Sequence, residues 1–273
     1  MRLTLPSPSI KIADMALRRQ AGVTLTELLV GTTVGSLVLI GISTTYVLGA
    51  RATTQNVEQA RLNQELRAVL EIMQQDLRRA GYWHYASVTA PELQENPFQS
   101  TVNGVDHRLR TDKVSGEANE SCLLYSYDLD ATGAIGICKR NKDAPCLVTG
   151  SYFDKPPYDQ EAMEMFGFQL KEQAVRMRLG RKDGADTTFT CNSGSWERIT
   201  SNDIRITTLQ FTIKTKEVNL KAGKESSACD TNDLCRETRW VDILMTGQLR
   251  DDPDVRQSLQ ATVDVRNDRY FIK

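Results

Sequence analysis

The sequence predicts an α+β fold in which one long N-terminal helix packs on an antiparallel β-sheet. Three observations predict it. Residues 28–50 form a continuous apolar segment without charge or proline, residues 51–80 carry an apolar stripe at helical spacing, and strand-like runs follow after residue 120. One long helix followed only by antiparallel strands is typical of α+β proteins, in which the helix covers one face of the sheet.

The composition is that of an ordinary globular protein. The chain has 273 residues, of which 25% are charged and 40% hydrophobic, and its formal net charge is −1. These values exclude wholesale disorder, a collagen-like repeat and a polytopic membrane protein. The balanced charge gives no basic field for nucleic acid. The two histidines, His84 and His107, are too few for a multi-histidine metal site.

The apolar segment 28–50 is long enough to cross a membrane. As a helix rising about 1.5 Å per residue it spans roughly 34 Å. It is too long for a cleaved secretory signal, whose apolar part is usually about 7–15 residues. Basic residues outnumber acidic ones upstream of it, which predicts a cytoplasmic N-terminus and an exported C-terminal part.

Residues 51–80 predict an amphipathic second half of the same helix, which then runs from Val23 to Ala80. This stretch contains no glycine or proline, and Gly81 suits the end of a helix. Its apolar residues recur every three or four positions, so we expect them to pack on the globular domain. They are Leu62, Leu66, Val69, Met73, Leu77 and Ala80. The charged residues assigned to the other faces are Arg61, Glu65, Arg67, Glu71, Asp76 and Arg78.

The remainder, residues 82–273, predicts a β-rich globular domain. Pro91, Pro97 and the polar residues up to Glu120 indicate a loop or insert rather than a core element. Beyond it, short runs rich in apolar residues predict strands, and two of them flank a short turn as in a hairpin. The runs are 122–127, the hairpin pair 165–170 and 174–179, 204–213, 240–249 and 259–266.

Six cysteines, all after residue 120, predict disulfides formed in an oxidising compartment. They are Cys122, Cys138, Cys146, Cys191, Cys229 and Cys235. Fifteen pairings are possible. Cys229–Cys235 is the favoured local bridge and Cys138–Cys146 the next, in which case Cys122–Cys191 joins two distant strands. A zinc site is the alternative, and the lack of close spacing between the thiols disfavours it.

Catalytic motifs are absent from the sequence, so we expect neither an enzyme nor a cofactor. Two acidic loops are weak calcium candidates. Asp128 and Asp130 begin a pattern that lacks the acidic residue a calcium loop needs at its twelfth position, and Asp230 and Asp233 lie between two cysteines. The preferred interpretation of both is a solvated turn, so no metal site is predicted.

The junction between the basic leader and the apolar segment carries the most informative motif. Gly22 separates the two, and Glu27 lies five residues further on. A carboxylate here has two interpretations: it favours the helix N-terminus through the macrodipole, or it has a function in the membrane.

The pattern Gly-Val-Thr-Leu-Thr-Glu at 22–27, after a basic leader, resembles the type IV prepilin signal. The resemblance implies that a prepilin peptidase cuts after Gly22, so that residues 1–22 are a removed leader. It further implies that Val23 becomes the N-methylated first residue and that Glu27 serves subunit assembly. The sequence departs from the family at Val23, where phenylalanine is usual. A start at Met15 would give the compact leader typical of the family.

The same resemblance implies a pilin-like fold. Residues 23–50 are then the transmembrane and filament-core half of the helix, and residues 51–81 are the amphipathic half. The segment ELRAVLEIMQQDLRRAGYW at 65–83 and the C-terminal VDVRNDRYF resemble PilW-type minor pilins, and the first also resembles the J-type pseudopilin of type II secretion.

The function expected from this resemblance is that of a type IV minor pilin in the tip complex that starts pilus assembly. The implied partners are other minor pilins, the major pilin, the prepilin peptidase, the inner-membrane assembly platform and a tip adhesin. The implied location is the inner membrane, with a single pass and a periplasmic C-terminal domain, and then the pilus tip. The alternatives are a J-type pseudopilin and a bitopic periplasmic binding module or enzyme with an uncleaved anchor.

Overall fold

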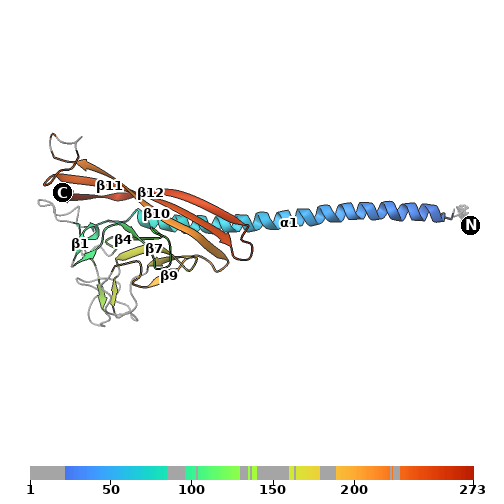
Figure 1. The fold of residues 1–273 in the computed structure, drawn as a ribbon, viewed down its shortest axis with the longest axis horizontal. Helices are drawn as coiled ribbons and strands as arrows, with labels where there is room; N and C mark the ends of the chain where they lie inside the picture. Colours follow the sequence, from blue (N-terminus) through green and yellow to red (C-terminus); the bar gives the residue numbers. More distant parts are fainter. Residues whose placement is uncertain are drawn as a thin grey trace, which may run out of the picture. The chain divides into compact units, whose positions relative to one another are not determined.

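A computed structural model of the chain describes residues 22–84, 96–102, 104–129, 135, 137–139, 160–162, 164–178, 189–221, 223 and 228–273. The chain divides into two compact units, Met1–Thr53 and Thr54–Lys273. The first unit contains the N-terminal part of helix α1, and the second contains the rest of that helix and the described strands (Figure 1). The predicted α+β fold is confirmed.

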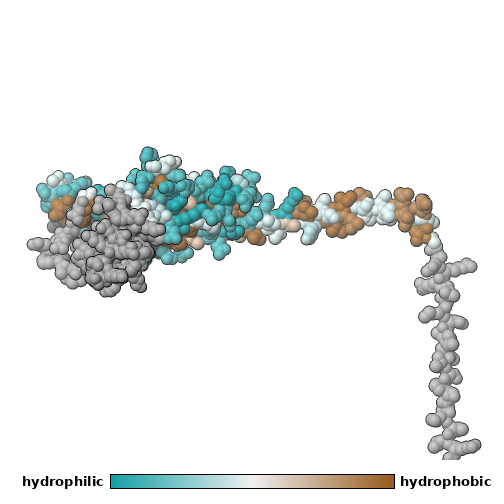
Figure 2. All heavy atoms as spheres, turned by 90° about the horizontal axis from the view of Figure 1, so that it is seen from below, coloured by the Kyte–Doolittle hydropathy of each residue, from teal (hydrophilic) through white to brown (hydrophobic). Residues whose placement is uncertain are grey.

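Helix α1 runs over Leu25–Leu77, within three residues of both predicted ends. Figure 2 shows apolar side chains along its N-terminal half, which are exposed in the isolated chain. Within the described residues, this is the one helix long and apolar enough to cross a membrane. Several of its hydroxyl groups donate to backbone carbonyls three or four positions earlier, as Thr33, Ser36 and Thr44 do, and these need no outside partner.

The C-terminal half of α1 buries the apolar stripe predicted for it. All six predicted positions, from Leu62 to Ala80, lie in the core. The prediction for Asp76 is wrong, because this residue was assigned to a solvent-facing side and is only 3% exposed. Asp76 follows Met73 by three positions and precedes Leu77 directly, so helical geometry places it on the same face as the stripe.

The larger strands form two antiparallel sheets instead of the single sheet expected. The first has the order β10-β11-β12, over Ile204–Asn219, Leu234–Leu249 and Arg256–Ile272. The second has the order β3-β4-β7-β8-β9, over Arg110–Asp112, Cys122–Ser126, Met165–Lys171, Ala174–Arg178 and Trp196–Arg198. The remaining elements are the 3₁₀ helix η2 (Pro97–Gln99) and the pairs β1 (Thr101–Val102) with β2 (Val105–Asp106) and β5 (Ile137–Lys139) with β6 (Gln160–Ala162).

One hydrophobic core joins α1 to both large sheets. Leu66 and Met73 of the helix belong to the same buried cluster as Phe168 of β7 and Ile243 of β11. The helix packs tightly against β11 at Gly247, where an added Cβ would lie 2.8 Å from a methyl group of Leu66. Glycine at this position therefore sets how near α1 can approach the sheet.

Two sequence predictions need correction in this unit. The three long strands extend beyond the predicted runs, because their polar ends are held by pairing across the sheet, as between Lys214 and Asp242 at 2.6 Å. The segment before Glu120 is also more than an insert. Phe98, His107 and Val114 are buried there, so its described part contributes to the packed interior.

Candidate processing and assembly site

The predicted cleavage point lies in exposed, non-helical backbone just before α1. Residues 22–24 have no regular secondary structure, and the helix begins at Leu25. Val23 is 73% exposed. Nothing lies within 4 Å of the place where a Cβ on Gly22 would stand. The peptide bond between Gly22 and Val23 is therefore open to a protease in the chain as described.

Thr24 and Glu27 form a reciprocal capping box at the start of α1. The Thr24 backbone N–H and hydroxyl both donate to Glu27 Oε2, at 3.0 and 2.8 Å, and the Glu27 backbone N–H lies 3.3 Å from Thr24 Oγ1. Such a pair satisfies helix N–H groups that have no intrahelical partner. This pair was not predicted from the sequence, although the Thr-x-x-Glu spacing that marks it is present at 24–27.

The capping box leaves part of the Glu27 carboxylate unused. Both hydrogen bonds go to Oε2, and Oε1 has no hydrogen bond within the described residues. Thr24 and Glu27 also lie on the same side of the Gly22–Val23 bond, so cleavage there would leave the box intact. The carboxylate can therefore hold the helix start and still offer one oxygen to a second group.

The turn that follows α1 is fastened to the last strand. The Asn267 side-chain amide donates to the carbonyls of Arg79 and Ala80, at 3.2 and 3.1 Å. Gly81 has a φ of +75°, as is usual where a helix ends, and its carbonyl accepts the Gln99 side chain at 2.8 Å. These bonds explain in physical terms why an asparagine stands in the C-terminal segment VDVRNDRYF.

A buried carboxylate fastens the last turns of α1 to β4. Asp76 accepts hydrogen bonds from the hydroxyls of Tyr125 and Tyr127, the second at 3.0 Å, and pairs with Arg79. Burial, followed by the nearby Asp76 charge, raises the pKa of both tyrosines. The Tyr127 ring also stacks on Phe166 with 4.0 Å between centroids. The cluster is fully paired and has a structural role.

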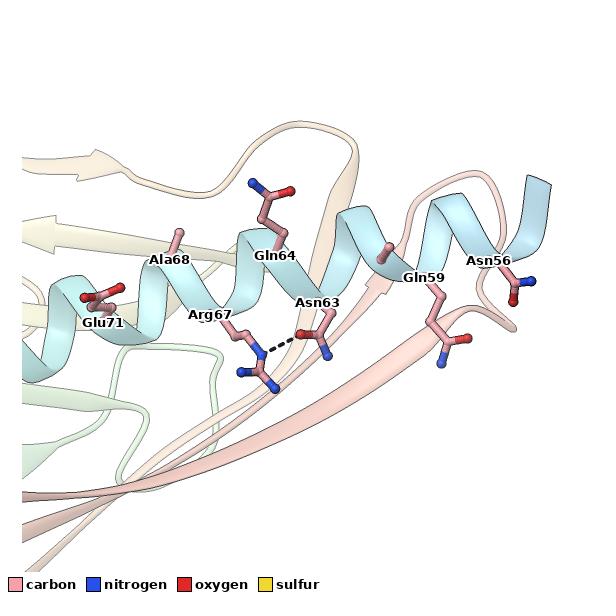
Figure 3. Close-up of a pocket in the computed structure, with 8 residues that line it drawn as sticks. Asn56, Gln59, Asn63, Gln64, Arg67, Ala68 and Glu71 are labelled. Atoms are coloured by element: carbon pink, nitrogen blue, oxygen red, sulfur yellow. Dashed lines mark hydrogen bonds between the residues drawn. The ribbon is translucent and has the colours of Figure 1, made fainter. Parts of the chain in front are cut away.

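One outward face of α1 is lined mainly by amide side chains, which Figure 3 shows in close-up. Asn56, Gln59, Asn63 and Gln64 lie along a shallow hollow there. Arg67 donates from Nε to Asn63 Oδ1 at 2.6 Å. This lining offers hydrogen bonds but no paired acid and base, so nothing in it points to catalysis.

The structure brings four of the six cysteines together in pairs. Cys122 of β4 is bonded to Cys191, 69 positions away, and Cys229 is bonded to Cys235. The Cys138 backbone lies in β5, but its side chain and the whole of Cys146 lie outside the described residues. The long-range bond ties the five-stranded sheet to the segment before β9.

The two acidic loops are engaged by protein groups where they are described. Asp128 accepts the His84 backbone N–H at 3.1 Å, and Asp130 lies outside the described residues. Asp233 is buried and accepts Lys221 Nζ at 3.0 Å and Asn219 Nδ2 at 2.7 Å. These two donors hold the pKa of Asp233 below its ordinary value. The described residues contain no group of three or more candidate metal ligands.

Comparison with known proteins assigns the chain to a family. A family model for prepilin peptidase-dependent protein B (PpdB) matches residues 55–265. The chain belongs to the PpdB family. The match begins after the N-terminal motif, so it is independent of the residues at 22–27 that first indicated a prepilin. A PpdB-family chain is thus a prepilin-related protein, in agreement with its apolar N-terminal helix.

The PpdB-family match is accompanied by one curated relative. A protein of Haemophilus influenzae (strain ATCC 51907 / DSM 11121 / KW20 / Rd), titled "Uncharacterized protein", is 25% identical over 201 residues. The matched part is 67% of this chain and 79% of the relative. No solved structure matches the chain.

Proposed function

We propose that this PpdB-family protein is a PilW-like type IV minor pilin, a non-enzymatic part of the tip complex that starts pilus assembly. The observation that carries the proposal is the exposed Gly22–Val23 bond directly before a capped apolar helix, in a family described as prepilin peptidase-dependent. Prepilin peptidase would remove residues 1–22 and leave Val23 as the N-methylated first residue. Residues 23–50 would cross the inner membrane and later enter the filament core.

The amphipathic residues 51–81 and the periplasmic domain 82–273 would then present the surface that other subunits contact. The partners proposed are other minor pilins, the major pilin, the inner-membrane assembly platform and a tip adhesin. The proposed end location is the pilus tip. Support comes from the family match and from the domain itself, whose hydrophobic core and disulfides join the second half of α1 and the sheets into one unit.

The proposed role of Glu27 rests on its unused oxygen. After cleavage the Val23 amine is a positive charge next to a membrane segment, where an isolated charge is expensive to bury. Glu27 Oε1 is free to accept it, either within the subunit or from the next subunit. We propose the second arrangement, in which the pair sets the axial position of the joining subunit.

N-terminal sequencing of the native protein tests the processing step. The expected result is a chain that begins at Val23, and Gly22→Val should leave the full-length precursor because the peptidase has no room for a side chain beside the scissile bond. A native chain that retains residues 1–22 would contradict the pilin assignment and favour an uncleaved anchor. Co-purification with pilus minor pilins rather than secretion components distinguishes the PilW-type from the J-type assignment.

Three substitutions separate the capping role of Glu27 from its proposed role in assembly. Glu27→Gln keeps an oxygen that can accept from Thr24 but removes the charge, Glu27→Ala removes both, and Thr24→Ala disrupts the cap but keeps the charge. We expect both Glu27 variants to be cleaved normally and to reduce surface piliation. Cells that carry Thr24→Ala should have normal surface piliation. Loss of piliation in Thr24→Ala with normal piliation in Glu27→Gln would show that capping alone matters.

A further inference from the structure

A small polar hollow lies where the β2–β3 connection meets strands β11 and β12. Its volume is about 200 Å³, below the roughly 300–1,000 Å³ usual for pockets that hold drug-sized ligands or cofactors. The charged residues that line it are Asp106, Arg108, Arg110, Glu237, Arg239 and Arg269. A space of this size suits a group no larger than a carboxylate, phosphate or sulfate.

Positive charge exceeds negative charge in this lining, with four guanidinium groups against two carboxylates. Asp106 is fully engaged by Arg108, through paired hydrogen bonds of 2.8 and 2.9 Å. Glu237 is the other carboxylate in the lining. Two carboxylates outside the lining also act on its arginines through their charge, Asp112 on Arg110 and Asp268 on Arg239.

Glu237 does not satisfy the two arginines nearest to it. Its oxygens lie 3.8 Å from Arg239 Nε and 3.8 Å from Arg269 Nη1, which is beyond hydrogen-bond distance. Arg110 instead donates to backbone carbonyls, those of Asp106 and Phe189. Among the described residues, Arg239 and Arg269 therefore have Glu237 nearby but no hydrogen bond to it.

Arg239 is the group that marks this hollow as a built site. Its side chain is 3% exposed, and its Nε–H has no hydrogen-bond acceptor in the part of the chain that the structure describes. Its Nη2 donates to the Asn267 carbonyl at 2.7 Å, which fixes the guanidinium plane. Burial, opposed by the Glu237 charge, lowers the pKa of Arg239 to about 10. Several buried arginine Nε groups of the described residues share this feature, but among them only Arg239 lines the hollow. A buried guanidinium N–H without an acceptor is energetically unfavourable, so this donor needs a partner that the described residues do not supply.

We infer that the hollow binds a small oxyanion, which accepts a hydrogen bond from Arg239 Nε and lies between Arg239 and Arg269. Oxygen anions are the strongest acceptors for arginine, and the planar guanidinium fits carboxylate and phosphate equally well. The ligand is thus inorganic phosphate from solution or the carboxylate of an acidic side chain on a partner. The inference is independent of the proposed pilus function.

Anion binding here would also support the end of α1. Arg239 holds the Asn267 backbone carbonyl, and the Asn267 side chain caps the carbonyls of Arg79 and Ala80. An anion that fixes Arg239 would strengthen this chain of contacts. Water alone could satisfy Arg239 Nε, but water would neither neutralise the excess charge nor distinguish one anion from another.

The test uses the full chain in a neutral detergent, in Tris-chloride buffer without other oxyanions. Inorganic phosphate is titrated against sodium chloride at equal ionic strength, and the unfolding temperature is followed. The expected result is a saturable rise with phosphate that chloride does not reproduce. Acetate is titrated in the same way: a response to acetate alone identifies a carboxylate as the ligand, and a response to phosphate identifies free phosphate as a ligand.

Two variants and one control locate the effect. Arg269→Gln should weaken anion affinity about tenfold, as expected for loss of a charge-assisted hydrogen bond. Glu237→Gln should tighten it, because the competing carboxylate is gone, and this gain cannot arise from misfolding. Arg256→Gln makes the same charge change at the exposed start of β12 and should have no effect. No saturable response to either anion, or equal responses in all four proteins, would overturn the inference.

Discussion

His107 should make the stability of the globular unit depend on pH. Its side chain is buried, stacks on Phe189 with 5.8 Å between ring centroids, and lies 3.4 Å from the Ser126 hydroxyl. Burial, together with the Arg110 charge, lowers the pKa of His107 to about 4, against about 6.5 for an exposed histidine. The unfolded chain therefore binds a proton at a higher pH than the folded chain does.

The sign and the size of the effect follow from this difference. The stability contribution is present above pH 6.5 and is lost as the pH falls from 6.5 to 4, because protonation then favours the unfolded chain. The full loss is about 3 kcal/mol, and between pH 7.5 and pH 5 it is about 2 kcal/mol. Carboxylates add their own dependence in this range, so the test compares variants rather than absolute values.

The assay is urea unfolding of residues 54–273 at pH 7.5 and pH 5, followed by tryptophan fluorescence. His107→Gln should lose about 2 kcal/mol less on acidification than the unchanged fragment does. His84→Gln is the matched control, because this histidine is exposed, and it should behave like the unchanged fragment. Equal losses in all three proteins would refute the argument that His107 is held neutral by burial.

Three further substitutions test the contacts that hold the globular unit together. Asp76→Leu leaves two buried tyrosine hydroxyls without their acceptor, and urea unfolding should show a loss of about 3 kcal/mol. Asn267→Ala removes the bonds to the carbonyls of Arg79 and Ala80 and should lower the free energy of unfolding by about 1 kcal/mol. Amide hydrogen exchange should become faster only in the segments next to these residues, and unchanged exchange there would contradict the role given to Asn267. Replacing Cys122 and Cys191 together by serine should lower stability by about 4 kcal/mol in thermal unfolding, since this bond closes a long loop.

Much of the fold could be predicted because its signals are local. The helix followed from residue spacing and from the lack of glycine and proline between residues 50 and 80, and the hairpin 165–179 from two apolar runs around a turn. The strand ends were missed because their polar residues are stabilised by cross-strand partners, such as Asp242 for Lys214, that lie far away in sequence.

In the candidate site too, residues with local sequence signals could be predicted and residues that depend on distant segments could not. Gly22 and Glu27 belong to one short motif, so both could be found, and the capping partner Thr24 could have been found from the Thr-x-x-Glu spacing. Asp76 was assigned to the solvent-facing side because it is charged, although its position in the helix places it on the face of the apolar stripe. Arg239 gave no signal at all, since its burial depends on segments more than a hundred residues apart that meet only in the folded chain.

The cap that Asn267 places on α1 has a consequence for the order of folding. The two groups it joins are separated by 187 and 188 positions, so the contact forms only between the beginning and the end of the globular unit. A chain made from its N-terminus forms this contact only after β12 has been synthesised and paired with β11. A chain that stops before residue 256 would leave the carbonyls of Arg79 and Ala80 without these bonds and one edge of β11 unpaired.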